Sequence, residues 1–147
     1  MNPRVESDHF VHQAIVTGDV AIVSQYLAEG GSPNITDCYD CEPIYTAVKY
    51  DRLDIAVMLL SAGANIFRRS KFRGDPFGAA CWNRNLRMID FCIAAGIEIN
   101  AVHQGQTILD DFATQKEWLA DTSMPSWQAT YDKLVQLGAK HSHETAS

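Results

Sequence analysis

The sequence predicts an all-α fold, a solenoid of stacked helix-turn-helix units joined by short hairpin loops. The first observation is that the 147-residue chain agrees with itself after a shift of 33 residues. Four columns repeat in register: Ala14, Ala47 and Ala80; Val20, Leu53 and Leu86; Leu27, Leu60 and Ile93; and Gly30, Gly63 and Gly96. A repeat of this period is typical of stacked supersecondary units that share one continuous core.

The second observation is the glycine that closes each apolar run. In "AVMLLSAG" the run ends at Gly63, where a residue without a Cβ ends a helix in the left-handed conformation at low cost. The alanine column is expected to let neighbouring helices approach closely. We predict a single domain over residues 1–147, with units at 8–35, 36–68, 69–101 and 102–140 and a tail at 141–147.

The segment Glu42 to Ile66, "EPIYTAVKYDRLDIAVMLLSAGANI", resembles the ankyrin repeat. The pattern of that family is a Thr-Pro-Leu-His start, an Ala-rich first helix, a Gly turn, an apolar second helix and a Gly-Ala end. His9 to Asn34 and Asp75 to Asn100 match it too. A fourth unit starts at "GQTILDDFA" and ends at "YDKLVQLGAK", with an insertion from Gln115 to Ser126. The resemblance covers roughly residues 8–140.

The chain also departs from the family pattern. Glu42 and Asp75 replace the Thr of the Thr-Pro start. The His position holds His12, Tyr45, Gly78 and Asp110. Because the family's Thr and His groups link adjacent repeats by hydrogen bonds, we expect fewer such bonds here and a stability below that of a consensus array.

Composition is ordinary for a globular protein, with 46% hydrophobic and 20% charged residues. The net charge of −6 disfavours nonspecific binding to nucleic-acid phosphates. No apolar run of signal-peptide length opens the chain, and none is long enough to span a membrane. We therefore expect a cytoplasmic monomer that contacts neither membrane nor nucleic acid, with four free thiols.

The motif "CYDC", Cys38 to Cys41, has three interpretations. It resembles half of a zinc site or a redox pair, but no second Cys/His pair at suitable spacing and no βαβ pattern accompany it. The third interpretation is two exposed thiols at a hairpin tip. We expect no metal and no cofactor. Cys81 and Cys92 fall in apolar helix columns and are expected in the core.

Catalytic signatures are missing from the sequence, which has no P-loop, no Gly-x-Ser-x-Gly and no His-Glu-x-x-His. The five histidines are scattered. A repeat array offers an extended concave face rather than a closed pocket. We expect no catalytic residues and no enzyme. An enzymatic function is the third alternative, behind two kinds of protein binding: inhibition of a partner and assembly of a complex.

The ankyrin resemblance implies that a partner is bound by hairpin tips and by residues at the ends of the first helices. These positions hold Tyr39, Cys41, Lys49, Tyr50, Lys71, Phe72, Trp82, Asn83, His103 and Gln104. Exposed Tyr, Phe and Trp side chains favour a partner that covers them. The alternative is that Phe72 folds back onto its own hairpin and Trp82 packs against the next helix.

Two predicted hairpins carry charges of opposite sign. The first, "TDCYDCE" (residues 36–42), is acidic, whereas the second, "FRRSKFRGD" (residues 67–75), is basic. The second hairpin supplies four cations to the predicted partner site: Arg68, Arg69, Lys71 and Arg73. This cluster fits a nucleic-acid contact, a solvated turn or an acidic patch on a partner protein, and we favour the last.

The resulting hypothesis is a protein that binds a partner protein through its concave face and works by stoichiometric inhibition, such as a bacterial immunity protein that covers the active site of a toxin. A regulatory adaptor that assembles a complex is the alternative. The insertion carries Trp118, and Trp127 follows it. These tryptophans either seal the end of the array or form a second partner contact.

Overall fold

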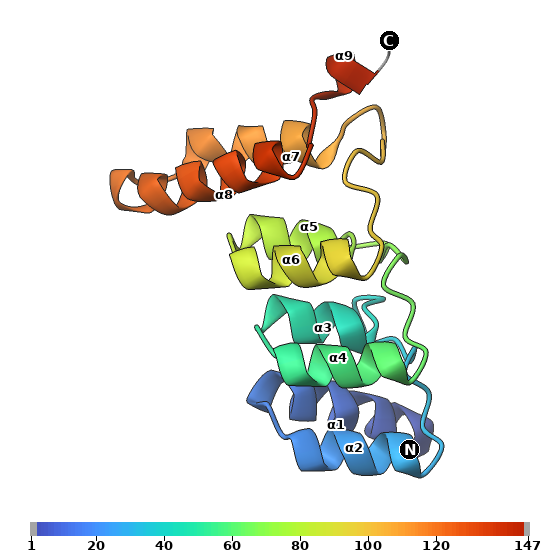
Figure 1. The fold of residues 1–147 in the computed structure, drawn as a ribbon. Coiled ribbons are helices and arrows are strands. Elements are labelled where there is room, and N and C mark those ends of the chain that lie inside the picture. The colour runs from blue at the N-terminus through green and yellow to red at the C-terminus, as the bar shows by residue number, and fades with distance from the viewer. Residues whose placement is uncertain (1–2, 146–147) are drawn as a thin grey trace. The chain divides into compact units, whose positions relative to one another are not determined.

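The computed structural model describes residues 3–145, and every regular element there is a helix (Figure 1). Within that range the only β pairing is two isolated bridges, Ser70 with Gly74 and His103 with Gln106, which close hairpin loops. The predicted all-α class is confirmed, while the ankyrin solenoid stays a prediction. The helices are α1 (Pro3–Thr17), α2 (Val20–Ala28), α3 (Pro43–Lys49), α4 (Leu53–Ser61), α5 (Pro76–Trp82), α6 (Leu86–Ala94), α7 (Ile108–Gln115), η1 (Lys116–Trp118), η2 (Asp121–Ser123), α8 (Met124–Gln136) and α9 (Ser142–Thr145).

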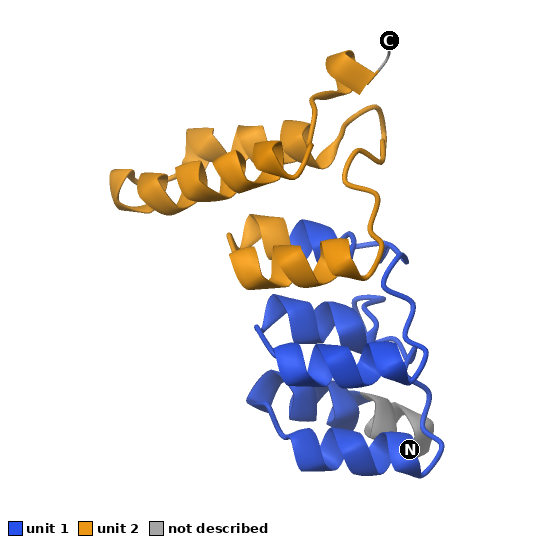
Figure 2. Ribbon diagram, in the orientation of Figure 1, with its two compact units in different colours: residues 1–79 blue, residues 80–147 orange. Residues whose placement is uncertain are grey.

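The chain forms two compact units, Met1–Ala79 and Ala80–Ser147, whose boundary lies within α5 (Figure 2). In unit 1, α1 packs on α2 and α3 packs on α4, and the two pairs meet through α1 with α3 and α2 with α4. In unit 2, α7 packs on α8. The predicted repeat boundaries are not tested by this division and stay predictions.

The turn between the two helices of a pair repeats at the predicted spacing. Gly18, Asp51 and Arg84 lie 33 residues apart and have positive φ angles of 77°, 59° and 55°. The amide of each following residue donates to a carbonyl five residues back, over 2.8 to 3.0 Å. The backbone therefore repeats even where the residue type changes from glycine to aspartate and arginine.

Each second helix ends in the same way. Gly30, Gly63 and Gly96 have φ angles of 86°, 96° and 99°, and Gly138 has 95°. After each glycine the next amide donates to a carbonyl five residues earlier, at 2.9 to 3.2 Å, as in a Schellman cap. The predicted glycine helix ends are confirmed. Gly138 follows Gly96 by 42 residues, nine more than the repeat, which measures the insertion in the last unit.

The core of each unit is made from the repeated apolar columns. Ala14, Ala47 and Ala80 are 4% exposed or less, as the close approach of helices requires. Cys81 and Cys92 are buried, which confirms their predicted place in the core. The largest buried side chains of unit 1 include Ile15, Ile44, Ile55 and Leu59, and those of unit 2 include Met88, Ile89, Leu109, Phe112 and Leu134.

Side chains in the His column do form long-range hydrogen bonds, contrary to part of the expectation from sequence. His12 bonds through Nδ1 to the Thr46 hydroxyl and through Nε2 to the Ile35 carbonyl, each at 3.0 Å. Tyr45 donates its hydroxyl to the Arg73 carbonyl at 3.3 Å. Two different side chains thus bond to the loop that follows their own helix pair. The replacement of His by Tyr at position 45 has therefore kept a hydrogen bond to that loop.

Asp110 fills the same column in unit 2 and also makes a link. Its carboxylate bonds to His141 Nδ1 at 2.8 Å and accepts from the Ser142 and Thr107 amides at 3.0 Å. Residues 142–145 form α9, and the His141 ring also bonds to the Tyr131 hydroxyl at 3.2 Å. The start of the expected tail is therefore packed against the last helix pair. Residues 146 and 147 lie outside the described range.

Replacement of Asp110 with asparagine should flatten the acid side of the stability profile. Burial alone would raise the pKa of Asp110, but hydrogen bonds from Thr107, His141 and Ser142 outweigh it and hold this pKa well below its usual value. A carboxylate with a lowered folded-state pKa stabilises the fold above the unfolded-state pKa of about 4, and this contribution is lost as the pH falls further.

The measurement is the urea midpoint of wild type and Asp110→Asn between pH 7 and pH 3. We expect the wild-type midpoint to fall more steeply below about pH 4. His141 and Glu144 also face the site and are unchanged between the two proteins. Asp132→Asn, at an exposed position of α8, is the matched control and should keep the wild-type profile. Parallel profiles for wild type and Asp110→Asn would contradict the assignment.

Trp118 in the insertion and Trp127 after it differ in burial. Trp127 is only 4% exposed, and its ring stacks between Phe112 and Tyr131, with centroids 5.5 and 5.1 Å away. Trp118, on η1, is 83% exposed. Trp127 therefore packs within the last helix pair, and its sealing of the array end stays a prediction, whereas that prediction is wrong for Trp118.

Candidate protein-binding surface

The tip of the first hairpin is fixed by its own side chains. The Asp37 carboxylate accepts from the amides of Tyr39 and Cys41 at 2.9 Å, and Asp40 takes a positive φ of 60°. This turn leaves the Tyr39 side chain 50% exposed. Cys41 is 3% exposed, so its expected place at an exposed tip is wrong; Cys38 is exposed as expected.

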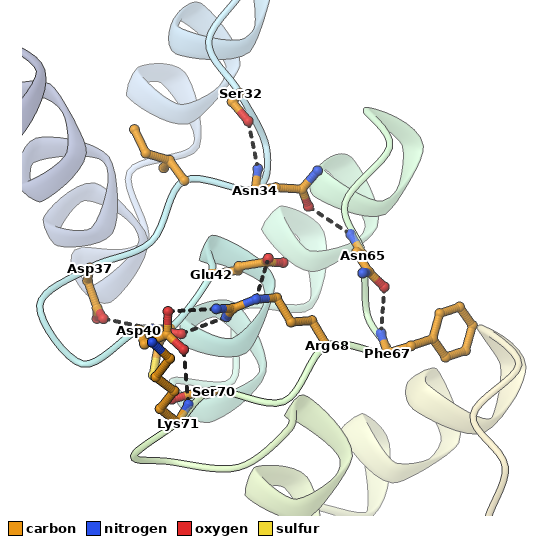
Figure 3. Close-up of polar contacts among 12 residues, drawn as sticks. Ser32, Asn34, Asp37, Asp40, Glu42, Asn65, Phe67, Arg68, Ser70 and Lys71 are labelled. Atoms are coloured by element: carbon orange, nitrogen blue, oxygen red, sulfur yellow. Dashed lines mark hydrogen bonds and ion pairs between the residues drawn. The ribbon is translucent and has the colours of Figure 1, made fainter.

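The second hairpin is anchored on the first by a cluster of hydrogen bonds (Figure 3). Arg68 donates to the carbonyl of Asp40 at 2.7 Å and to its carboxylate at 2.6 Å. The Ser70 hydroxyl donates to the Tyr39 carbonyl at 2.8 Å, and the Lys71 amide donates to the Asp40 carboxylate at 3.0 Å. The Lys71 amide and the Arg68 guanidinium lower the pKa of Asp40, so this carboxylate stays charged at neutral pH.

Glu42 completes the cluster beneath the tips. Its side chain is 9% exposed, and its Oε1 lies 3.4 Å from Arg68 Nε. Burial raises the pKa of Glu42, and Arg68 opposes that rise. Arg68 is therefore occupied by two carboxylates within the fold, which makes it an anchor of the second hairpin as well as a predicted partner residue. Arg69 is likewise paired with Asp75, at 3.0 Å.

Four residues form what we call the hairpin-tip patch: Tyr39, Lys71, Phe72 and Arg73. The Arg73 guanidinium carbon lies 4.5 Å from the centroid of the Tyr39 ring, so the two hairpins meet at the surface as well. Phe72 is 70% exposed, which excludes the alternative that it folds back onto its own hairpin. Lys71 and Arg73 are exposed beside these two rings.

Lys49 and Tyr50 lie at the C-terminal end of α3, where the ankyrin resemblance placed them. Tyr50 is 43% exposed, and Lys49 Nζ lies 5.5 Å from its ring centroid. Unit 1 thus presents two exposed tyrosines, and each is accompanied by a cation.

Unit 2 carries the remaining predicted residues. Trp82, the last residue of α5, is 52% exposed, and its carbonyl accepts from Gln115 Nε2 at 2.9 Å. Asn83 next to it is exposed. His103 and Gln104 are exposed on the loop closed by the His103–Gln106 bridge. Whether these residues and those of unit 1 act on one partner stays a prediction.

Sequence reasoning missed an asparagine column that ties loops together. The Asn34 side chain accepts from the Asn65 amide at 2.9 Å (Figure 3) and donates to the Gly63 carbonyl at 3.5 Å. Asn100 does the same with Lys140 and Gly138, at 2.8 and 2.9 Å. Phe67 stands midway between them at the 33-residue spacing and is 61% exposed. The 33-residue alignment of the sequence contains this column, with asparagine at 34 and 100 and phenylalanine at 67.

The described residues form neither a metal-binding cluster nor a membrane-spanning helix. Among the described side chains, no three His, Cys, Asp or Glu residues gather in a way that could hold a metal ion. None of the helices between residues 3 and 145 combines the length and apolarity needed to cross a bilayer.

Comparison with known proteins gives partial support for the repeat interpretation. No model of a known protein family matches the chain. The chain is 39% identical over 74 residues to the 2-5A-dependent ribonuclease of Mus musculus, a protein with ankyrin repeats. The match covers 50% of this chain and 10% of the ribonuclease, so the chain spans only a small part of that relative. This similarity suggests ankyrin repeats and a protein-interaction module.

Proposed function

We propose that the chain is a non-enzymatic ankyrin-repeat protein that binds a partner protein through its exposed hairpin tips and helix ends. The observation that carries this proposal is the group of exposed aromatic side chains in unit 1. Tyr39, Tyr50 and Phe72 are 43–70% exposed. Tyr39 and Phe72 lie on two hairpins joined by hydrogen bonds, and Tyr50 caps the C-terminal end of α3. Rigid exposed aromatics bind a protein surface at a low cost in conformational entropy.

The binding serves stoichiometric inhibition, as in an immunity protein that covers the active site of its toxin. In this proposal the exposed aromatics are the anchors, and the cations of the second hairpin orient a partner that carries an acidic patch. The chain acts as a monomer in the cytoplasm, a reducing compartment where its four free thiols persist.

An adaptor function is the second candidate, and Trp118 favours it. This residue is 83% exposed in unit 2, outside the predicted partner set of unit 1. Exposed aromatic side chains on each of the two units suit a protein that holds two partners together. An inhibitor needs only one of them.

An affinity pull-down with a triple variant, Tyr50→Ala with Phe72→Ala and Trp82→Ala, tests the proposed function. Each aromatic anchor contributes more than about 1 kcal/mol at a protein interface, so we expect the affinity for a captured partner to fall by at least about a hundredfold. The matched control replaces exposed apolar residues outside the predicted set with alanine: Phe10, Val57 and Val135. Circular dichroism establishes that both variants are folded.

The purified partner then separates the two functions. Loss of a partner's catalytic activity at equimolar protein supports inhibition, whereas full activity in the complex supports an adaptor. Capture that survives the triple replacement overturns the proposed anchors.

A further inference from the structure

The hairpin tips expose more positive charge than their sequence suggests. All four carboxylates nearby are engaged within the fold. Asp40 and Glu42 pair with Arg68, Asp75 pairs with Arg69, and Asp37 accepts from two amides of its own turn. The cations left to face solvent are Lys71 and Arg73, although the chain as a whole carries a net charge of −6.

Arg73 is held in a geometry suited to a carboxylate. Its guanidinium carbon lies over the Tyr39 ring, 4.5 Å from the ring centroid, and this cation–π contact favours one position of the group. The five N–H donors of a guanidinium point outward from the edges of its plane, and the exposed Arg73 side chain can offer them for a bidentate contact. The Arg73 backbone is fixed as well, because its carbonyl accepts from Tyr45 and its amide donates to Ser70.

Phe72 lies between Lys71 and Arg73 in the sequence and offers an apolar surface to a ligand. Its side chain is 70% exposed, and its amide donates to the Ser70 hydroxyl at 3.2 Å, which fixes the base of the side chain. A ligand made only of charge would leave this ring in water. A nucleic acid would need more phosphate contacts than two cations provide.

Building on the proposed protein-binding function, we propose that the hairpin-tip patch recognises an acidic peptide segment of its partner. A carboxylate of that segment pairs with Arg73, a second carboxylate pairs with Lys71, and an aromatic or large aliphatic side chain packs against Phe72. Arg73 is the residue that determines specificity, because its backbone is held by Tyr45 and Ser70 and its guanidinium contacts the Tyr39 ring before the partner arrives.

Selection from a phage library of random dodecapeptides on the immobilised full-length chain tests this inference before the natural partner is identified. We expect wild type to enrich peptides with an excess of Asp and Glu around an aromatic or large aliphatic residue. The charge-reversed variant, Lys71→Glu with Arg73→Glu, should lose this preference and enrich Lys and Arg. The matched control, Arg87→Glu with Lys140→Glu, reverses exposed charges of unit 2 and should select as wild type does.

Anisotropy with the enriched peptide, synthesised with a fluorescent label, then assigns the contacts. Arg73→Gln and Phe72→Ala should each weaken binding at least about tenfold, as expected for hot-spot contacts. Acidic peptides that bind both variants as well as wild type would overturn the location. Enriched peptides without acidic excess would overturn the partner chemistry and leave the binding function standing.

Other occupants of the patch have their own readouts. Tighter binding of labelled single-stranded DNA or RNA than of the selected peptide would assign the patch to nucleic acid and overturn the inference. Self-association in sedimentation that the charge reversal abolishes would assign it to a second copy of the chain. A library that enriches no peptide on wild type would overturn the inference, while the pull-down still tests the broader function.

Discussion

Replacement of Trp127 with alanine is expected to lower the unfolding free energy of unit 2 by about 3–5 kcal/mol, the usual cost of deleting a large buried aromatic side chain. The ring is 4% exposed and stacks between Phe112 and Tyr131. Its Nε1 also donates to the Phe112 carbonyl at 3.2 Å, and Lys116 lies over the ring. Deletion therefore opens a cavity between α7 and α8 and leaves a buried carbonyl without its donor.

The measurement is urea unfolding followed by far-UV circular dichroism, because fluorescence would change with the tryptophan itself. Trp118→Ala, in the preceding insertion, is the matched control. Its side chain is 83% exposed, so its loss should change stability by no more than about 0.5 kcal/mol. Equal effects of the two replacements would contradict the sealing role of Trp127.

The repeated backbone could be predicted from sequence because its determinants are local. A glycine after an apolar run ends a helix through its own φ preference, and Gly30, Gly63 and Gly96 all do so. Alanine at a 33-residue period predicts a close contact between helices of successive repeats. These signals depend on a few neighbouring residues, so distant contacts need not be known.

The hydrogen bonds between successive repeats could not be predicted, because different side chains bond to the same kind of acceptor. His12 and Tyr45 share neither size nor charge, yet each bonds to a backbone carbonyl of the following loop. Comparison with a family pattern shows only that a residue has changed. The geometry decides whether the new side chain can still bridge the gap.

The candidate site was predicted in part. Exposure of Tyr39, Tyr50 and Phe72 followed from their positions in the repeat. The separate roles of Arg68 and Arg73 did not, because the Arg68–Asp40 ion pair joins residues 28 positions apart and requires the two hairpins to meet. The burial of Cys41 has the same origin, since Ser70 of the second hairpin docks on the turn beside it.

His12→Ala should destabilise unit 1 by about 2–3 kcal/mol, because two buried or partly buried polar groups lose their partner at once. The His12 side chain is 6% exposed and joins α1 both to the Thr46 hydroxyl on α3 and to the Ile35 carbonyl in the loop between α2 and α3. Leaving such groups unsatisfied costs about 1–3 kcal/mol each, and only part of this is recovered if water enters.

Urea unfolding gives the change in free energy, and hydrogen exchange at the amides of α3 locates it. His103→Ala, at an exposed position in unit 2, is the matched control and should be nearly neutral. His12→Gln retains a donor and an acceptor and should recover part of the loss. If His12→Ala unfolds at the wild-type urea concentration, the bonds of His12 add nothing to the fold.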